Sequence, residues 1–266
     1  MIRLSLIGLA ALACAAGTPA FAKVTAAEAD HLGKDLTCVG AEKAGNKDGT
    51  IPEFSGKWLG TPPGMTYTPH VGEHPIDPYP NDKPLFSITA QNVAQYGDKL
   101  SDGQKAMFAR YPKTFRIDVY PSRRDFRYAD FVCASAKTNA LNSEVGTDGL
   151  FVKNGVKGSA PFPIPKTAME VFWNHTLPYR AYTDSTLRDY GNVLSSGAVA
   201  WGRALNLSYG IKNDPKDVGK PLEGIQAYNR SYTYLPERDK GTVTVTSEPV
   251  NFAKDKRLAW TYDPGT

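Results

Sequence analysis

The segment His70-Val71-Gly72-Glu73-His74 carries two histidines and a glutamate at a spacing that could bind zinc. It matches the H-x-x-E-H pattern of the inverted zinc peptidases. That pattern needs a helix, because a helix brings residues four positions apart onto one face. Pro69, Gly72 and Pro75 disfavour a helix here. Solvated loop histidines, or a looser metal site on a loop, therefore fit the segment better than a peptidase centre.

Three arginines, Arg123, Arg124 and Arg127, form a basic cluster between a predicted strand and a predicted helix. Guanidinium groups bind phosphate and carboxylate groups through paired hydrogen bonds. The cluster therefore indicates either a low-affinity site for a lipid head group or a solvated charged face.

The chain lacks the motifs of well-known catalytic centres. It has no G-x-S-x-G, C-x-x-C, P-loop or G-x-G-x-x-G segment. Residues 46–51 resemble the middle of a calcium loop, but the first ligand and the final bidentate glutamate of such a loop are missing. We therefore expect a protein that is not an enzyme and that has no catalytic residue, no metal and no cofactor.

The composition limits the class of protein. Among 266 residues, 41% are hydrophobic and 22% are charged, which is typical of a globular protein and excludes a disordered, fibrous or multi-pass membrane protein. The formal net charge is +4, too close to neutral for a dedicated nucleic-acid binder.

Residues 1–22 have the layout of a secretory signal peptide. Met1-Ile2-Arg3 is a positive start, an apolar run follows, and Ala20-Phe21-Ala22 is an A-x-A cleavage site. The apolar run is too short for a permanent membrane anchor. We therefore expect export to the periplasm, with association with the outer membrane as an option. Lipidation at Cys14 is the alternative, although Ala11 stands where such signals usually have leucine.

Two cysteines, Cys38 and Cys133, remain after cleavage at that site. In an oxidising compartment an even pair indicates a disulfide. The alternative is two buried free thiols, because cysteine packs like a small hydrophobic residue.

The order of elements predicts an α+β fold. Residues 23–84 are expected to form a short helix, opened by the capping box of Thr25 and Glu28, and then a draped segment rich in proline and glycine. Residues 85–266 are expected to form helices plus an antiparallel sheet, in one domain with 23–84. Helical patterns lie near 89–99, 101–111, 128–139 and 166–175, and residues 114–120 alternate as a half-buried strand.

The last third of the chain predicts an antiparallel meander. Residues 198–209, 226–235, 242–246 and 257–262 read as strands without helices between them. In the first of these strands the large residues share one face with Arg203, and small residues share the other. The chain has 14 Tyr, 11 Phe and 4 Trp. Aromatic residues on these strands therefore line either an apolar cavity or an ordinary hydrophobic core.

Several short phrases of the sequence together resemble one family. The resemblance covers nearly all of the mature chain. This family is a domain of unknown function in exported proteins of Gram-negative bacteria, often labelled outer-membrane lipoprotein-sorting protein. The phrases are Leu32-Gly33-Lys34-Asp35-Leu36-Thr37, Val39-Gly40-Ala41-Glu42-Lys43-Ala44-Gly45-Asn46, Asp48-Gly49-Thr50-Ile51-Pro52-Glu53, Asp82-Lys83-Pro84-Leu85-Phe86, Phe162-Pro163-Ile164-Pro165, Trp173-Asn174-His175 and Arg257-Leu258-Ala259-Trp260-Thr261-Tyr262-Asp263-Pro264-Gly265.

The resemblance implies a relative of the periplasmic lipoprotein carrier and its outer-membrane receptor. Such proteins fold as a strongly curved antiparallel sheet, a half-open barrel with helices packed on its concave side over an apolar cavity. The resemblance also implies an export pump of the resistance-nodulation-division type as partner. It carries no catalytic residues. Cys38 stands where many relatives have proline. Relatives also continue past the Tyr-Asp-Pro-Gly phrase, so we expect C-terminal strands that pair with residues 257–262 to be missing here.

The leading hypothesis is a periplasmic lipid- or lipoprotein-binding carrier. It would bury acyl chains, which gains about 25 cal/mol per Å² of apolar surface removed from water. The alternatives are an envelope metal-dependent hydrolase that uses His70, Glu73 or His74, and a non-catalytic outer-membrane assembly partner. The candidate cavity residues are Phe115, Ile117, Val119, Trp201, Leu205, Leu207, Trp260 and Tyr262.

Overall fold

The computed structural model describes residues 23–57, 77, 79–124 and 126–264. The expected signal peptide 1–22 and the histidine segment 70–74 lie outside the described residues. The described α-helices are α1 (Ala26–Ala29), α2 (Asp102–Arg110), α3 (Asp130–Asn142) and α4 (Ala168–Thr176), and the short 3-10 helices are η1 (Val93–Lys99), η2 (Ile211–Asn213) and η3 (Glu237–Asp239). The described strands are β1 (Phe86–Ile88), β2 (Ile117–Val119), β3 (Glu144–Val145), β4 (Val152–Lys153), β5 (Thr183–Val193), β6 (Val199–Tyr209), β7 (Ile225–Leu235), β8 (Val243–Pro249) and β9 (Leu258–Tyr262).

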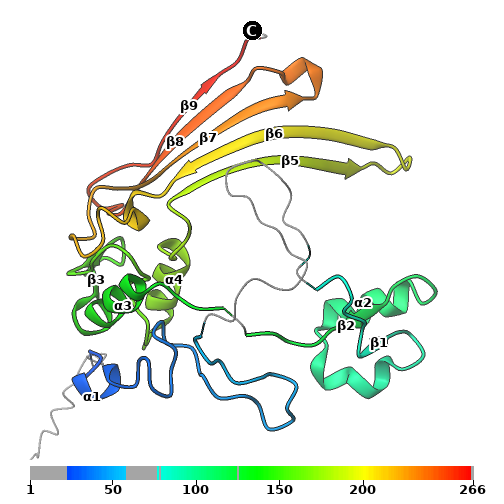
Figure 1. Ribbon diagram of the computed structural model, residues 1–266. Coiled ribbons are helices and arrows are strands. Elements are labelled where there is room, and N and C mark those ends of the chain that lie inside the picture. The colour runs from blue at the N-terminus through cyan, green and yellow to red at the C-terminus, as the bar shows by residue number, and fades with distance from the viewer. Residues whose placement is uncertain (1–22, 58–76, 78, 125, 265–266) are drawn as a thin grey trace, which may run out of the picture.

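A five-stranded antiparallel sheet dominates the fold. Its strands follow one another in the order β5-β6-β7-β8-β9. The sheet is curved, and in the described part of the chain it stays open instead of closing into a barrel (Figure 1). The predicted combination of helices with an antiparallel meander is therefore confirmed. Strand β5 had not been predicted.

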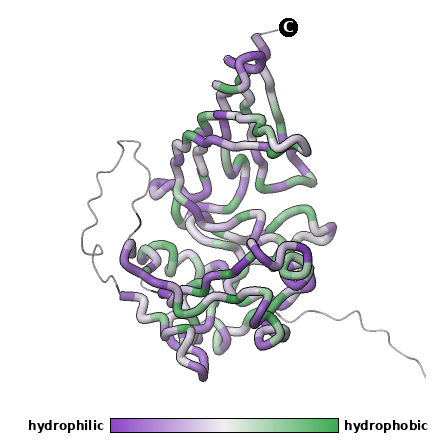
Figure 2. Tube along the Cα trace, turned by 90° about the vertical axis from the view of Figure 1, so that its right-hand side faces the viewer, coloured by the Kyte–Doolittle hydropathy of each residue, from purple (hydrophilic) through white to green (hydrophobic). Residues whose placement is uncertain are grey.

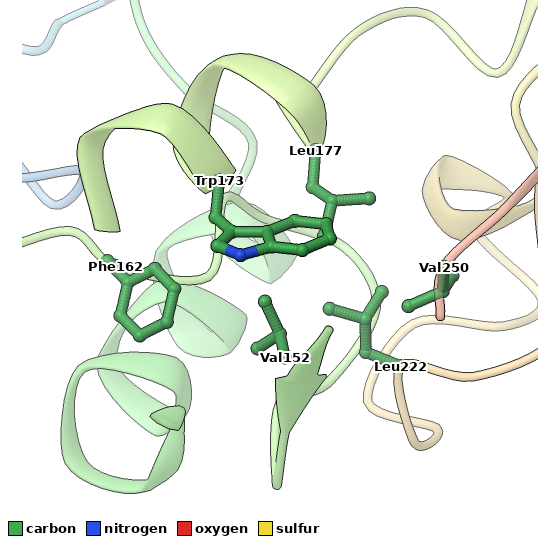
Figure 3. Packing of buried hydrophobic residues seen from close by; sticks show 6 residues of the cluster. All are labelled: Val152, Phe162, Trp173, Leu177, Leu222 and Val250. Atoms are coloured by element: carbon green, nitrogen blue, oxygen red, sulfur yellow. The ribbon is translucent and has the colours of Figure 1, made fainter. Parts of the chain in front are cut away.

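The helices α3 and α4 lie beneath one end of this sheet (Figure 1). This arrangement is compatible with the expected curved sheet and its helices. In the hydrophobic core at this end, Trp173 of α4 is 1% exposed and packs against neighbouring segments (Figure 3). The nitrogen Nε1 of Trp173 donates a hydrogen bond of 3.1 Å to the carbonyl oxygen of Gly149. The cluster consists of Val152, Phe162, Trp173, Leu177, Leu222 and Val250.

The strands β1 and β2 form a second, two-stranded antiparallel sheet, and η1 and α2 lie beside it (Figure 1). Helix α2 begins with the predicted capping box, in which the Ser101 hydroxyl accepts a hydrogen bond from the Gln104 amide. The ring of Phe108 in α2 meets Phe115 edge to face, with centroids 4.7 Å apart. We call residues 86–119, which include β1, η1, α2 and β2, the small unit. It has its own apolar contacts, apart from the five-stranded sheet.

The N-terminal segment 23–57 is fastened to the body at several points. Helix α1 has the predicted capping box of Thr25 and Glu28. Asp30 at the end of α1 accepts a hydrogen bond of 2.9 Å from Lys137 of α3, and Glu28 also pairs with Lys166. The segment therefore contacts both α3 and the residues just before α4.

Candidate functional site

One face of the five-stranded sheet is apolar across all five strands. In an antiparallel sheet, directly opposed residues point to the same side. The register opposes Leu187 to Leu205 and Leu205 to Tyr232, and it continues from Tyr232 to Val243 and from Val243 to Tyr262. The alternation of hydropathy along these strands can be followed in Figure 2. We call this surface the apolar face; its other large members are Val193, Val199, Trp201, Leu207, Tyr209, Tyr228, Val245, Leu258 and Trp260.

Large side chains of the apolar face are open to solvent. Trp201 is 62% exposed, Trp260 is 55% exposed and Tyr262 is 65% exposed. Leu205 and Leu207, in the middle strands, are half-buried. Large apolar patches of this kind on a protein surface usually mark a binding surface.

One ion pair interrupts the apolar face. Arg203 and Asp189 are directly opposed across β6 and β5. The guanidinium of Arg203 donates two hydrogen bonds to the Asp189 carboxylate, of 2.5 and 2.7 Å. The Asp189 carboxylate raises the pKa of Arg203 above its ordinary value. The pair therefore satisfies its own two charges; Arg230, which opposes Leu207, is a further charged residue on this face.

The predicted cavity residues fall into two separate places. Trp201, Leu205 and Leu207 share the apolar face with Trp260 and Tyr262. Residues 115–119 instead belong to the small unit, where β2 pairs only with β1 in the described chain. The structure therefore does not bring Phe115, Ile117 and Val119 into the same sheet as the other predicted cavity residues. Alternation gives the face of a strand but does not tell which sheet the strand joins.

A hollow of about 420 Å³ lies in the small unit, between η1 and α2. It is lined mainly by small apolar residues together with Phe108 and Lys105. Phe115 contacts Phe108 from the side. The hollow is therefore next to one predicted cavity residue, and no residue of the apolar face lines it.

The opposite face of the five-stranded sheet is polar and carries a second hollow, of about 490 Å³. Two rows of polar residues cross four strands there. In the first row Asp184 opposes Ser208, which opposes Asn229, which opposes Thr246. In the second row Thr186, Asn206, Ser231 and Thr244 oppose one another in the same way. We call these residues the polar rows.

Three arginines line the same hollow. Arg180 precedes β5, and Arg188 lies in β5 on the side of the polar rows, opposite Ala204. The hollow also reaches Arg230, but this residue opposes Leu207 and so belongs to the apolar face. The sequence pattern did not predict this hollow, because its lining residues are far apart in the chain and β5 lacks a hydrophobic period.

A buried lysine lies close to Arg180. Lys212 is 3% exposed, and its ammonium group donates hydrogen bonds to the Pro178 carbonyl oxygen at 2.5 Å and to Asn213 at 2.9 Å. Burial, with a smaller contribution from the positive charge of Arg180, lowers the pKa of Lys212 to about 7. Burial therefore favours the neutral form of this lysine over its charged form.

The predicted basic cluster is engaged in contacts within the protein. Arg123 donates to the Asp82 carboxylate and lies 3.6 Å from the centroid of the Tyr79 ring. Arg124 donates to backbone carbonyl oxygens of the N-terminal segment, including that of Glu42 at 2.5 Å, and Arg127 pairs with Asp130 at 2.6 Å. These contacts favour a structural role, and a head-group site at this cluster stays a prediction.

The structure joins Cys38 and Cys133 in a disulfide across a sequence separation of 95, with Cα atoms 5.0 Å apart. Cys133 lies in α3, so the bridge fastens the N-terminal segment to that helix. Of the two arrangements that the sequence left open, the structure has the bridge.

Metal-binding clusters and membrane-spanning helices are both absent from the described residues. No group of three or more His, Cys, Asp or Glu side chains in the described ranges could hold a metal ion. His70, Glu73 and His74, which the hydrolase hypothesis invokes, lie outside those ranges. Within the described part, every helix is too short or too polar to cross a bilayer.

Comparisons with known proteins place the chain among proteins without an assigned function. It is 38% identical over 251 residues to "Uncharacterized protein PA3922" of Pseudomonas aeruginosa, which covers 93% of this chain and 53% of that protein. The chain therefore spans about half the length of the curated relative that it matches. No solved structure matches it. Residues 87–266 match the family described as "Protein of unknown function (DUF1329)", and the chain belongs to this family.

Proposed function

We propose that the protein is a non-catalytic carrier of the bacterial periplasm that binds the acyl chains of a lipid or lipoprotein on the apolar face. The observation that carries this proposal is the exposure of aromatic side chains there, above all Trp201, Trp260 and Tyr262. Covering such side chains with hydrocarbon is favourable by about 0.8 kcal/mol for each buried methylene group.

The chemistry of the apolar face suits a flexible apolar ligand. Aromatic rings and branched aliphatic side chains alternate across the strands and offer dispersion contacts without directional bonds. The Arg203–Asp189 pair satisfies its own charges, so an acyl chain could pass beside it without leaving a bare charge in contact with hydrocarbon. Binding on this surface needs no bond to be made or broken.

The sequence phrases described above connect the proposal with lipoprotein sorting. Under this proposal the carrier passes its cargo between envelope proteins and works together with an export pump of the resistance-nodulation-division type. An outer-membrane location for one step of that transfer belongs to the same proposal. The apolar face is also compatible with a protein partner, since β9 is an edge strand of the sheet within the described residues.

Native lipid extraction followed by mass spectrometry tests the proposal. Purified protein is expected to carry phospholipid or lipoprotein-derived acyl chains at a defined ratio. The double variant Trp201→Ser with Trp260→Ser is expected to carry severalfold less. Phe172→Ser is the matched control, because Phe172 is 56% exposed but lies in α4.

The result that overturns acyl binding is equally specific. A folded wild-type protein without co-purifying lipid, which also takes up no lipid from phosphatidylglycerol vesicles, would contradict it. Capture of a defined envelope protein through Trp201 and Trp260 in the absence of lipid would instead favour the assembly-partner function.

A further inference from the structure

The polar hollow carries side chains that have no partner within the protein. Asn206, Ser208 and Ser231 are half-buried. In the described part of the chain their side chains form no hydrogen bond to another residue. Half-buried amide and hydroxyl groups normally bind protein or an external group. These three therefore offer donors and acceptors to a ligand or to water in the hollow.

Two of the arginines at the hollow are also free of ion pairs. Neither Arg180 nor Arg188 pairs with a carboxylate among the described residues. The carboxylate that lines the hollow, that of Asp184, accepts a hydrogen bond of 2.7 Å from the Thr186 hydroxyl. Two guanidinium groups on this side of the sheet against one carboxylate leave the hollow positive.

We propose that this hollow binds a phosphorylated polyol, with its phosphate held by Arg180 and Arg188 and its hydroxyl groups on the polar rows. Guanidinium groups bind phosphate oxygens through charge-assisted hydrogen bonds. The amides and hydroxyls of Asn206, Ser208 and Ser231 can each donate to and accept from a sugar or glycerol hydroxyl. Asp184 supplies a further acceptor for such a hydroxyl.

The volume of about 490 Å³ suits such a ligand, because pockets for small molecules begin at roughly 300 Å³. The site lies on the opposite face of the sheet from the apolar face, so it does not depend on acyl binding. The same chemistry is offered by a free sugar phosphate and by the head group of a phospholipid.

Isothermal titration calorimetry with glycerol 3-phosphate tests the site. The wild-type protein is expected to bind glycerol 3-phosphate, to bind inorganic phosphate more weakly, and to show no measurable binding of glycerol. Arg180→Gln and Arg188→Gln are each expected to weaken the binding of glycerol 3-phosphate roughly tenfold, which corresponds to one lost charge-assisted hydrogen bond. Arg238→Gln is the matched control, since the Arg238 side chain is 84% exposed and lies in η3, outside the hollow.

A second arm of the experiment distinguishes the two sources of the phosphate. If the natural ligand is a lipid head group, the wild-type protein binds phosphatidylglycerol vesicles more tightly than phosphatidylcholine vesicles, and Arg180→Gln with Arg188→Gln removes this preference. If it is a free sugar phosphate, glycerol 3-phosphate binds and the two kinds of vesicle are not distinguished. The proposal is overturned if glycerol 3-phosphate at 10 mM (roughly the weakest affinity a small site would show) does not bind, or if the double variant binds it as tightly as the wild type. Circular dichroism confirms that the variants are folded.

Discussion

The backbone of Gly40 passes against the carbonyl oxygen of Pro163, so closely that a Cβ atom on Gly40 would lie 1.6 Å from that oxygen. Gly40 also has a φ of +92°, in the left-handed region. This contact seats the N-terminal segment on residues 161–165, which precede α4. Two of the phrases that carry the family resemblance thus meet in space.

Gly40→Ala is expected to lower the free energy of unfolding by about 2 kcal/mol or more, because both the backbone conformation and the approach to Pro163 are lost. Gly33→Ala is the control, since Gly33 has a φ of +84° but open space around it. It should cost about 1 to 2 kcal/mol, from backbone strain alone. Urea denaturation measures both changes, and equal losses would show that the contact with Pro163 contributes nothing.

Trp173→Ala is expected to remove about 3–5 kcal/mol of stability, because it opens a cavity in the core cluster. The neighbouring Phe172 is 56% exposed, so Phe172→Ala should change stability by about 0.5 kcal/mol or less. Chemical denaturation of both variants makes the comparison. A similar loss at both positions would contradict the assignment of the core to one side of α4.

The stability of the protein is expected to rise with pH between about 7 and 10. Lys212 has a pKa of about 7 in the folded protein and an ordinary value of 10.5. In this window the unfolded chain binds more protons than the folded one, so raising the pH favours folding by at most about 1.4 kcal/mol per pH unit.

Urea denaturation at pH 7, 8 and 9 tests this dependence. Lys212→Met should flatten the rise, whereas Lys216→Met, at an exposed position of the same loop region, should preserve it. An identical pH profile in the wild type and in Lys212→Met would show that Lys212 does not carry the effect.

The ion pair between Asp189 and Arg203 can be tested by exchange. Asp189→Arg opposes two guanidinium groups across β5 and β6, and it is expected to lower the melting temperature. Adding Arg203→Asp to that variant restores opposite charges and should recover most of the loss. The melting temperatures of the two single variants and the double variant form the test. No recovery in the double variant would mean that the pair does not stabilise the register.

The double variant Cys38→Ala with Cys133→Ala is expected to lose about 2–4 kcal/mol of stability, because the disulfide restricts the unfolded chain. Dithiothreitol should lower the stability of the wild type by a similar amount and leave the double variant unchanged. A wild-type protein that is insensitive to the reductant under denaturing conditions would contradict the bridge.

Strands β6 to β9 could be predicted from sequence because their large residues alternate with small or polar ones. Strand β5 could not, since its segment from Thr183 to Val193 is mostly polar and nearly all exposed. It becomes a strand by pairing along its full length with β6. The hydrophobic pattern within one segment does not reveal its pairing with another strand.

The candidate sites likewise differ in how far the sequence predicts them. The common face of Trp201, Leu205 and Leu207 follows from alternation within one strand. The separation of Ile117 from them does not, because it depends on the pairing of β2 with β1. The polar hollow is assembled from single residues on four strands, so no short stretch of sequence signals it.

The bridge between Cys38 and Cys133 closes a covalent ring that includes residues 39–132. A protease that cuts once anywhere inside this ring leaves two fragments that are still joined through sulfur. Such a nicked protein would run as one species without reductant and as two with it. A single cleavage between Cys38 and Cys133 therefore cannot separate the N-terminal segment from α3.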